Sequence, residues 1–248
     1  MSSGIFSNAV GYLNLATADS TSAFGHRNEA SGFRSGAFGT FNDALGEGSD
    51  VFGSSNEVSA VNGSAFGSSN DVFVRGSAAF GNSNNIQNNG GGSDVSCNAF
   101  GISNIVSGDE TSAFGFSNNV SGDGSSTFGN SNRASDDGSN AFGRRNQASG
   151  ASSSAFGNSN DALGANSSAF GYFNEATASQ ANAFGYFTLS DVFGLTAIGR
   201  YNADPSGNST TWVATDPVFI VGNGQSAASR STALTILKNG NMGIGNAT

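Results

Sequence analysis

The sequence has few of the residues on which catalytic and metal sites depend. Its 248 residues include one cysteine, one histidine, two prolines and nine lysines or arginines, and only 11% of all residues are charged. The lone cysteine, Cys97, cannot form an intrachain disulfide bond. The lone histidine, His26, cannot build a cluster of histidine ligands within one chain. We therefore expect no metal site and no cofactor.

Basic residues and long apolar runs are also scarce. The formal net charge is −9, and a nucleic-acid-binding surface needs clustered lysine and arginine to neutralise phosphates. No apolar stretch approaches the roughly 20 residues that a membrane-spanning helix requires. These absences predict no nucleic-acid partner and no membrane insertion of this segment.

Catalytic motifs are missing as well. The sequence contains no nucleophile elbow, phosphate-binding loop, Cys-x-x-Cys pair or calcium-binding glycine repeat. Its acidic pairs, such as Asp136-Asp137, are adjacent in sequence, which tends to point their side chains apart in a strand or turn. We therefore expect no catalytic residues and no enzyme activity. A glycan-degrading spike is kept as the alternative, because it would need carboxylates that meet in a groove.

What the sequence has in excess is glycine and phenylalanine in strict phase. It contains 37 Gly and 21 Phe. Gly follows each phased Phe, Asn stands four residues after it, and Ala, Val or Ile stands six residues after it in most copies. The phased Phe residues are at positions 24, 38, 52, 66, 80, 100, 114, 128, 142, 156, 170 and 184, and Val10 and Ile198 extend the series. The period is 14 residues except for one interval of 20, so the chain holds about fourteen copies.

This repeat predicts an all-β solenoid. A 14-residue unit is too short for a pair of helices, and Gly and Asn are poor helix formers. The alternation in "SAFG" predicts a strand with Phe on one face and Ala on the other. Two short strands joined by tight turns then form one coil, and equivalent residues of successive coils stack. We expect Gly, after Phe and in "ASG" or "VSG", to supply turns with positive φ.

The columns of the repeat lead to expectations for individual side chains. The Asn column predicts either a ladder of hydrogen-bonded side-chain amides or simple turn propensity. The small residue six positions after each Phe favours a Phe that packs inside the coil, and the alternative is a Phe that faces an axis shared between chains. Cys97 is expected as a small buried filler, and His26 as an exposed residue on the outer surface.

The thin coil also predicts self-association. One large side chain and a few small ones per coil bury too little apolar surface to offset the ordering of 14 residues. Side-by-side packing of several chains would bury a second face of every coil. We therefore expect an obligate oligomer.

The phrase "S-x-A-F-G-x-x-N-x-A-x-G-x-x-S" resembles the head repeat of trimeric autotransporter adhesins of the YadA type, over about residues 7–204. That family has Ile where this chain has Phe, and only Ile198, in "TAIGRYNAD", is the residue that the family has at this position. The resemblance implies a left-handed parallel β-roll in which three chains surround one axis. It therefore implies a homotrimer with a role in cell adhesion.

The segment "DPVFIVGNGQSAASRSTALTILKNGNMGIG", residues 216–245, resembles a part of bacteriophage tail fibres and related bacterial fibre proteins. In those proteins it commonly precedes a C-terminal chaperone domain that trimerises the chain. We accordingly predict a repeat domain over 1–204, with an insertion near 88–93, and a small β module over 205–248. The module should contain strands at "PVFIVG" and "TALTILK" and a tight turn at Asn239-Gly240.

Two features are candidates for ligand binding. One is a set of aromatic residues in the same two columns of successive repeats, namely Tyr172, Phe173, Tyr186, Phe187 and Tyr201. They could form a platform for sugar rings, or they could fill the junction between the repeat and the terminal module. The other is the extra stretch in the 20-residue interval, with Asn88, Asn89 and Ser93. It could be a working loop or a tolerated surface bulge.

Together these patterns predict a structural and adhesive function. The expected protein is a trimeric extracellular fibre, on a bacterial surface or on a phage virion tail. Its expected partners are further copies of itself and the cell-surface glycans or outer-membrane components of another cell. A purely structural spacer without a ligand is the weaker alternative.

Overall fold

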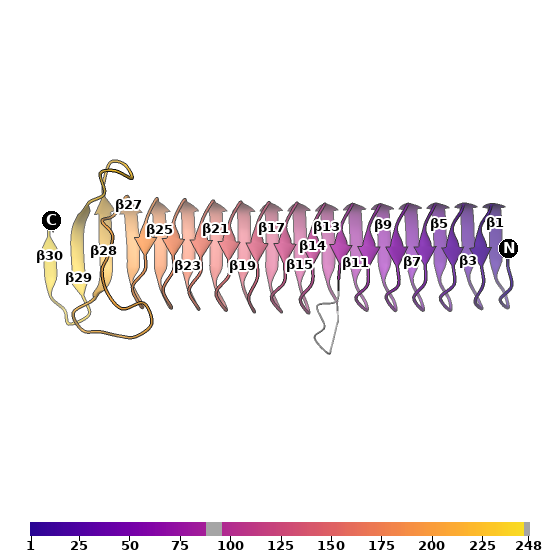
Figure 1. The fold of residues 1–248 in the computed structure, drawn as a ribbon, viewed down its shortest axis with the longest axis horizontal. Coiled ribbons are helices and arrows are strands. Elements are labelled where there is room, and N and C mark those ends of the chain that lie inside the picture. The colour runs from indigo at the N-terminus through magenta and orange to yellow at the C-terminus, as the bar shows by residue number, and fades with distance from the viewer. Residues whose placement is uncertain (88–95, 246–248) are drawn as a thin grey trace. The chain divides into compact units, whose positions relative to one another are not determined.

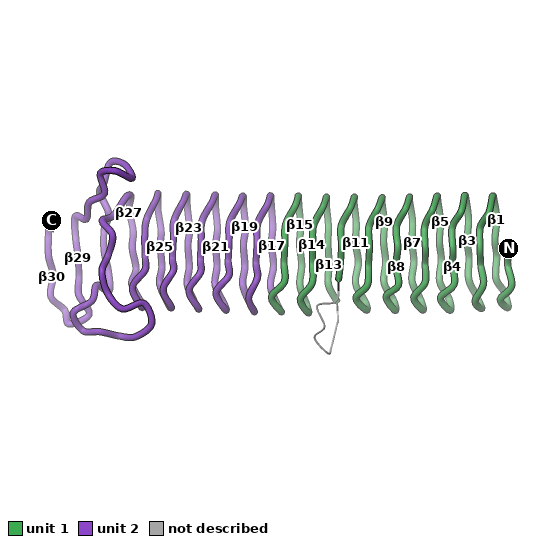
Figure 2. Tube along the Cα trace, in the orientation of Figure 1, with its two compact units in different colours: residues 1–124 green, residues 125–248 purple. Residues whose placement is uncertain are grey.

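The computed structural model describes residues 1–87 and 96–245, and all regular secondary structure in them is β-strand. The chain divides into two compact units, Met1–Gly124 and Ser125–Thr248, and each is described by itself (Figure 2). Within the described ranges, no helix is long and apolar enough to cross a bilayer. The predicted all-β class is confirmed.

Each repeat forms one coil of a parallel β-solenoid, as Figure 1 shows. In the coil of Phe156, a five-residue strand, β21 (Ser154–Asn158), is followed by a corner and a two-residue strand, β22 (Asp161–Ala162). A second corner then leads into the next coil. The described residues contain thirteen such strand pairs and one further long strand. The predicted repeat architecture is confirmed in this form.

The strands of the two units follow in chain order. In the first unit the long strands are β1 (Asn8–Tyr12), β3 (Ser22–His26), β5 (Gly36–Thr40), β7 (Asp50–Ser54), β9 (Ser64–Ser68), β11 (Ala78–Asn82), β13 (Asn98–Ile102) and β15 (Ser112–Phe116). Its short strands are β2 (Leu15–Ala16), β4 (Glu29–Ala30), β6 (Asp43–Ala44), β8 (Glu57–Val58), β10 (Asp71–Val72), β12 (Asn85–Ile86), β14 (Ile105–Val106) and β16 (Asn119–Val120). In the second unit the other long strands are β17 (Ser126–Asn130), β19 (Asn140–Arg144), β23 (Ser168–Tyr172), β25 (Asn182–Tyr186) and β27 (Thr196–Arg200). Its other short strands are β18 (Arg133–Ala134), β20 (Gln147–Ala148), β24 (Glu175–Ala176) and β26 (Leu189–Ser190).

Within each unit, neighbouring coils pair so that like residues lie over like. Phe80 in β11 pairs with Phe66 in β9 and with Phe100 in β13. The register therefore holds across the 20-residue interval, because the six extra residues do not shift the strands on either side. The predicted insertion itself, near 88–93, lies outside the described residues.

The interior of each coil is filled by small side chains, and Phe is not among them. Ala155 is fully buried, whereas the next residue, Phe156, points to the outside and is partly exposed. The buried columns consist of Ala or Val before Phe, the Asn column, the Ala, Val or Ile column, and a Ser or Thr column. The expectation that Phe packs inside the coil is thus wrong. The interior of a 14-residue coil is too narrow for a phenyl ring, so strand alternation turns the small residue inward.

Glycine after Phe is required by a close approach between coils. Gly157 has φ of +120°, a conformation that L side chains rarely adopt, and a Cβ there would lie 2.1 Å from the carbonyl oxygen of Gly171. It lies inside a strand and not in a turn. The corners are instead formed by left-handed residues such as Ser159 and Asn166, with φ of 56° and 57°. The expectation that Gly supplies the turns is therefore wrong for most corners.

The Asn column forms a continuous ladder within each unit. The side-chain nitrogen of Asn160 donates to the side-chain oxygen of Asn146 at 3.0 Å and to the carbonyl oxygens of Phe156 and Gly171. The side-chain oxygen of Asn160 accepts from the backbone and side-chain nitrogens of Asn174. The ladder is the correct one of the two readings of this column, since these amides are buried and bonded coil to coil.

At the last coil, a side chain takes the place of a further strand at the edge of the sheet of short strands. Thr188 replaces Asn in the column and donates its hydroxyl to the side-chain oxygen of Asn174. Asn202 then bonds the backbone of Leu189 twice, through its side-chain oxygen to the N–H at 2.8 Å and through its side-chain nitrogen to the carbonyl at 3.0 Å. The amide of Asn202 thus replaces the backbone of a further strand and satisfies the edge at β26.

Three strands follow the repeat, namely β28 (Pro217–Asn223), β29 (Thr232–Leu237) and β30 (Met242–Ile244). Strand β28 pairs in parallel with β27, and β29 and β30 add antiparallel strands beyond it. The strands expected at "PVFIVG" and "TALTILK" are confirmed, and β29 and β30 form a hairpin with Gly240 in the connection. The division into domains at residue 204 stays a prediction.

Candidate functional site

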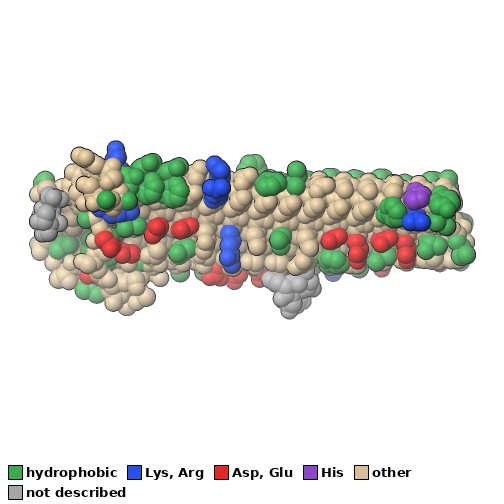
Figure 3. All heavy atoms as spheres, turned by 45° about the horizontal axis from the view of Figure 1, so that its top comes forward, with side chains coloured by type: hydrophobic (Ala, Val, Ile, Leu, Met, Phe, Trp, Pro, Cys, Tyr) green, Lys and Arg blue, Asp and Glu red, His purple; other side chains and the backbone are tan. Residues whose placement is uncertain are grey.

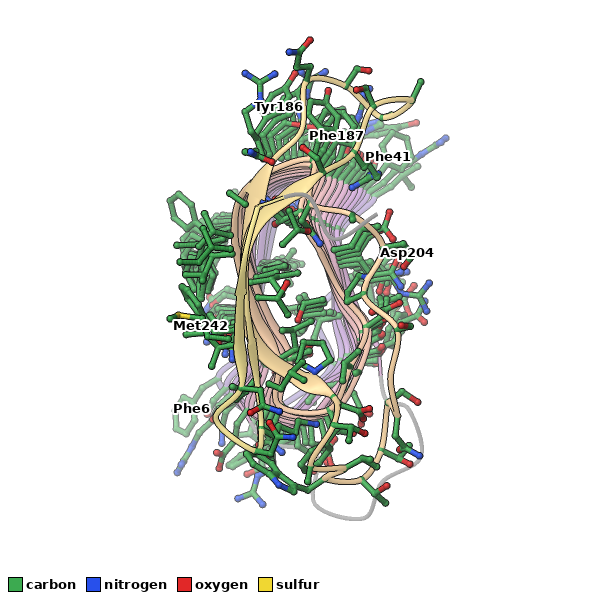
Figure 4. All side chains as sticks on the ribbon, turned by 90° about the vertical axis from the view of Figure 1, so that its left-hand side faces the viewer. Phe6, Phe41, Tyr186, Phe187, Asp204 and Met242 are labelled. Carbon is green, nitrogen blue, oxygen red and sulfur yellow. The ribbon has the colours of Figure 1, made fainter. Side chains whose placement is uncertain are left out.

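Five aromatic residues gather at one corner of the second unit. Tyr172 and Tyr186 end the long strands β23 and β25, and Phe173, Phe187 and Tyr201 each follow a long strand at the corner. We call these five residues the aromatic corner. Figure 3 shows hydrophobic side chains gathered at the surface over β23 and β25, and Figure 4 shows Tyr186 and Phe187 projecting together away from the coil interior.

The coil register stacks these rings in two columns. Tyr172 pairs with Tyr186 in the sheet, and their ring centroids are 5.2 Å apart at an angle of 6°. In the second column, Phe173 lies 4.8 Å from Phe187, and Phe187 lies 4.9 Å from Tyr201. The left-handed conformations of Phe173 and Phe187, with φ of 52° and 55°, place the second column beside the first. The result is a stack in which neighbouring rings cover each other's faces and the outer edges of the rings meet solvent.

Polar groups flank one end of this stack. The Arg200 guanidinium lies 5.6 Å from the ring centroid of Tyr201, and it donates to the carbonyl oxygen of Gln225 at 3.0 Å. Tyr186, Arg200, Tyr201 and Gln225 line an open pocket of about 450 Å³. A hydrogen bond with Tyr201 raises the pKa of the Tyr186 hydroxyl above its usual value. Aromatic faces beside hydroxyl and guanidinium groups suit a ligand that combines apolar ring faces with hydroxyls.

The terminal segment covers the other side of Tyr201. Arg230 lies 5.8 Å from the Tyr201 ring centroid and donates to the carbonyl oxygens of Phe187 and Asn202. Tyr172 and Tyr186, in contrast, remain 39% and 42% exposed. The two expectations for these rings therefore hold at different ends of the stack. Tyr201 fills the junction with the terminal segment, and Tyr172 and Tyr186 remain open to solvent as a ligand platform requires.

The structure thus brings together all five predicted aromatic residues. The other predicted ligand-binding residues, Asn88, Asn89 and Ser93, lie outside the described residues. Gln225 and Arg230 were missed by sequence reasoning, because no periodicity connects the terminal segment to the repeat. Arg200 follows from the 14-residue count, since it occupies the column of Tyr172 and Tyr186.

The first unit has a smaller aromatic group in the same two columns. Tyr12 and His26 stack with centroids 5.3 Å apart, and Phe41 meets His26 edge to face. Arg27 lies 5.4 Å from the Phe41 ring centroid. His26 therefore lies at the outer surface of its coil, as expected. In the described part of the chain, no group of three His, Cys, Asp or Glu side chains is arranged to hold a metal ion.

An apolar stripe follows the outer face of the long strands in each unit. In the first unit it comprises Val10 and the Phe residues 24, 38, 52, 66, 80, 100 and 114. In the second unit it comprises the Phe residues 128, 142, 156, 170 and 184, and then Ile198. We call these two sets the Phe stripe of each unit.

The rings of the Phe stripe stack closely and remain partly exposed. Phe66 and Phe80 have centroids 4.7 Å apart, and Phe24 and Phe52 are 36% and 39% exposed. With about 200 Å² per phenyl side chain and at most 39% of any one exposed, the seven rings of the first unit leave a few hundred Å² of aromatic surface in contact with solvent. A contiguous apolar patch of this size is among the largest that a monomeric protein exposes, and such patches are often functional.

Carboxylates form a column of their own on the short strands. Glu29, Asp43, Glu57 and Asp71 pair in register in the first unit. Burial, together with the neighbouring carboxylates Glu29 and Glu57, raises the pKa of Asp43. Like charges directly opposite each other destabilise a sheet, so this column weakens its coils at neutral pH.

The second unit contains a more strongly perturbed carboxyl group. Burial, and next the charge of Asp204, raises the pKa of Asp191 to about 6. Asp161 has a raised pKa for the same first reason, with a smaller contribution from Glu175. These groups lie on the side of the short strands, and Figure 4 shows Asp204 on the side opposite Met242.

A scan against protein-family models finds no family that matches the chain. A search of the curated proteins finds no match either.

Proposed function

We propose that this chain is a segment of a homotrimeric extracellular fibre that attaches to another cell, on a bacterial surface or a phage tail. The observation that supports it best is the Phe stripe, because it gives nearly every coil a partly exposed aromatic residue at the same place. The aromatic corner supports the adhesive part of the proposal, with a surface glycan or an outer-membrane component as the ligand.

The repeat of the Phe stripe favours a further copy of the same chain as its partner. Stable interfaces bury about 800 Å² per partner, and the Phe stripe of each unit contributes a few hundred Å² of aromatic surface towards such an area. A cover must present apolar groups at the spacing of the coils, which is 4.7 Å between the ring centroids of Phe66 and Phe80. A second copy of this chain has the same coils and therefore the same spacing. The adhesin-like repeat supports three copies around the axis.

The aromatic corner supports a sugar as the ligand. Pyranose rings pack their apolar faces on aromatic rings, and neighbouring polar groups bind their hydroxyls. Tyr172 and Tyr186 offer the rings, and Arg200 lies beside them at the pocket. Three copies of the corner in a trimer would raise the avidity for a glycan-coated surface.

Sedimentation tests the self-association. The wild-type chain should sediment with three times its monomer mass of 24.8 kDa. A variant with Phe142→Ser, Phe156→Ser and Phe170→Ser should shift towards monomer, because it opens a polar gap in the stripe. A wild-type protein that stays a folded monomer at micromolar concentration contradicts the proposal.

A glycan array tests the adhesive part. Tyr172→Asn combined with Tyr186→Asn should remove binding, and Asn is acceptable there because Asn158 holds this strand position in another coil. Phe116→Asn is the matched control, since Phe116 is 47% exposed at the same position of a coil in the first unit. Equal binding by both variants would remove the aromatic corner as the ligand site.

The same array separates the alternatives. Release of sugar fragments from bound glycans would favour a glycan-degrading spike over an adhesin. A trimer that binds neither glycans nor bacterial outer-membrane preparations would favour a structural spacer. Binding without release is the result expected from the proposal.

A further inference from the structure

A repeating apolar stripe leaves one property of an assembly undetermined, namely its register along the fibre. Phe follows Phe at nearly constant spacing, with centroids 4.8 Å apart for Phe142–Phe156 and for Phe156–Phe170. If copies slide by one coil, every ring still meets a ring. Register is weakly specified where a strand pattern repeats without a distinguishing feature. An assembly through the Phe stripe therefore needs an element that does not repeat.

The three terminal strands contain such an element. Their pairing continues the Phe column from Ile198 to Val221, Leu234 and Ile244. The outer face of the long strands thus extends from the last coils onto β28, β29 and β30. The continuation is no longer periodic, because β29 and β30 run antiparallel to their neighbours.

The same strands also add a second apolar column. Two residues before each Phe, the coils carry polar residues such as Ser154 and Ser168. At the terminal strands, this column becomes Phe219, Ile236 and Met242. Residues two apart in a strand share a face, so each terminal strand presents two outward apolar side chains where a coil presents one.

This wider patch is uncharged and, at its edge, open to solvent. Its six side chains are Phe219, Val221, Leu234, Ile236, Met242 and Ile244. Met242 is 62% exposed and Ile244 is 81% exposed, whereas Ile220 between the two columns is 3% exposed and faces inward. Figure 4 shows Met242 projecting outward from its strand. We call these six side chains the terminal patch.

We propose that the terminal patch is the lock that fixes the axial register between copies of this chain, with the terminal patches of the other copies as its partners. The proposal depends on the self-association proposed above. Its support is the continuity of the terminal patch with the Phe stripe, the apolar character of both sets of side chains, and a width that occurs once per chain. A copy shifted by one coil would set Phe219 of one chain against Thr196 in the last coil of its neighbour, and one terminal strand would extend past its neighbour's last strand.

Disulfide trapping in a Cys97→Ser background tests the lock. One preparation carries Phe142→Cys, a second carries Phe170→Cys, and the two are mixed, co-refolded and oxidised. The two positions are two coils apart, roughly 10 Å at the usual strand spacing, which is too far for a disulfide between aligned chains. Pairs of identical positions therefore report aligned copies, and mixed pairs report copies that have slipped by two coils.

With the intact terminal patch, mixed pairs should stay below about a tenth of the identical pairs, and Met242→Ser with Ile244→Ser should raise them to about the same level. Both residues are exposed, so the change leaves the fold intact. Leu163→Ser with Ile105→Ser is the control, because these exposed apolar residues lie away from the long strands and should leave the mixed pairs rare. Mixed pairs that remain rare in a trimeric Met242→Ser/Ile244→Ser variant overturn the lock.

A second measurement leaves the terminal patch unchanged. A chain that lacks residues 154–167, one whole coil, is co-refolded with the full-length chain. Alignment at the terminal patch predicts that position 142 of the shortened chain pairs with position 156 of the full-length chain, and that position 170 pairs with itself. Trimers that pair 142 with 142 across the two chains overturn the lock alone. A parent protein that is monomeric overturns self-association, and the lock with it.

Discussion

Replacement of Asn160 by Ala should strongly destabilise the second unit. The side chain of Asn160 is fully buried, its two amide N–H groups are shared among three acceptors, and its oxygen accepts two hydrogen bonds. A buried hydrogen bond contributes about 1 kcal/mol net, so the loss of these four donor and acceptor sites costs about 4 kcal/mol. For a chain of this size, each 1 kcal/mol lowers the melting temperature by about 2–4 °C, so a fall of about 8–16 °C is expected.

Two further variants make the result specific to the ladder. Asn160→Thr should cost about half as much, because a Thr hydroxyl can still donate to the preceding amide, as Thr188 does to Asn174 at 2.6 Å. Asn130→Ala is the control, since the side chain of Asn130 is exposed and its oxygen accepts the hydroxyl of the neighbouring Ser131. Melting should be followed by circular dichroism at one fixed protein concentration, because association contributes to the melting temperature.

A small difference in melting temperature between Asn160→Ala and its control would refute the contribution of the ladder to stability. If Asn160→Ala melts within about 2 °C of Asn130→Ala, which is under 1 kcal/mol, the buried amides add little to stability. The Asn column would then be explained by turn propensity, and the ladder would be a by-product of the coil geometry.

Three more predictions follow from the coil. Gly157→Ala should prevent folding of its coil or cost more than about 3 kcal/mol by chemical denaturation, whereas Gly138→Asn, at a left-handed corner with φ of 66°, should be tolerated. Asp191 has a higher pKa in the folded state, about 6 against 3.8, so the folded state binds the proton more tightly and stability should fall as pH rises from about 4 to about 6. Asp191→Asn should remove that fall, which is about 1 kcal/mol after solvent screening, when melting is compared at pH 4 and pH 7. Cys97 is fully buried, so a thiol reagent should label it only on unfolding, and complete labelling of the native protein would contradict the buried position.

The sequence predicts the coil well because its period leaves few alternatives. A 14-residue unit with one Phe, one Asn and two small apolar positions fits two short strands, and the structure pairs them as expected. The direction of Phe could not be read from the pattern, because Ala155 and Phe156 are both apolar and alternation alone does not say which face is inside. The width of the closed coil decides it, and that width is a property of the backbone.

The corners and the aromatic corner likewise combine features that the period predicts with features that only the folded backbone determines. Ser159 adopts a left-handed conformation that propensity would assign to glycine, because the neighbouring coils hold it there. The five residues of the aromatic corner can be found by counting 14 residues. Gln225 and Arg230 cannot, since they reach the corner only when the chain folds back along the last coil.

The unbroken register between Phe80 and Phe100 has a practical consequence. Asn104 bonds the side-chain oxygen of Asn84 at 2.9 Å over a separation of 20 residues, just as other coils do over 14. A corner of this solenoid can therefore take additional sequence while the stack on both sides stays aligned. That position is a suitable place to graft a foreign peptide, such as an epitope or an affinity tag, at a known height on the scaffold.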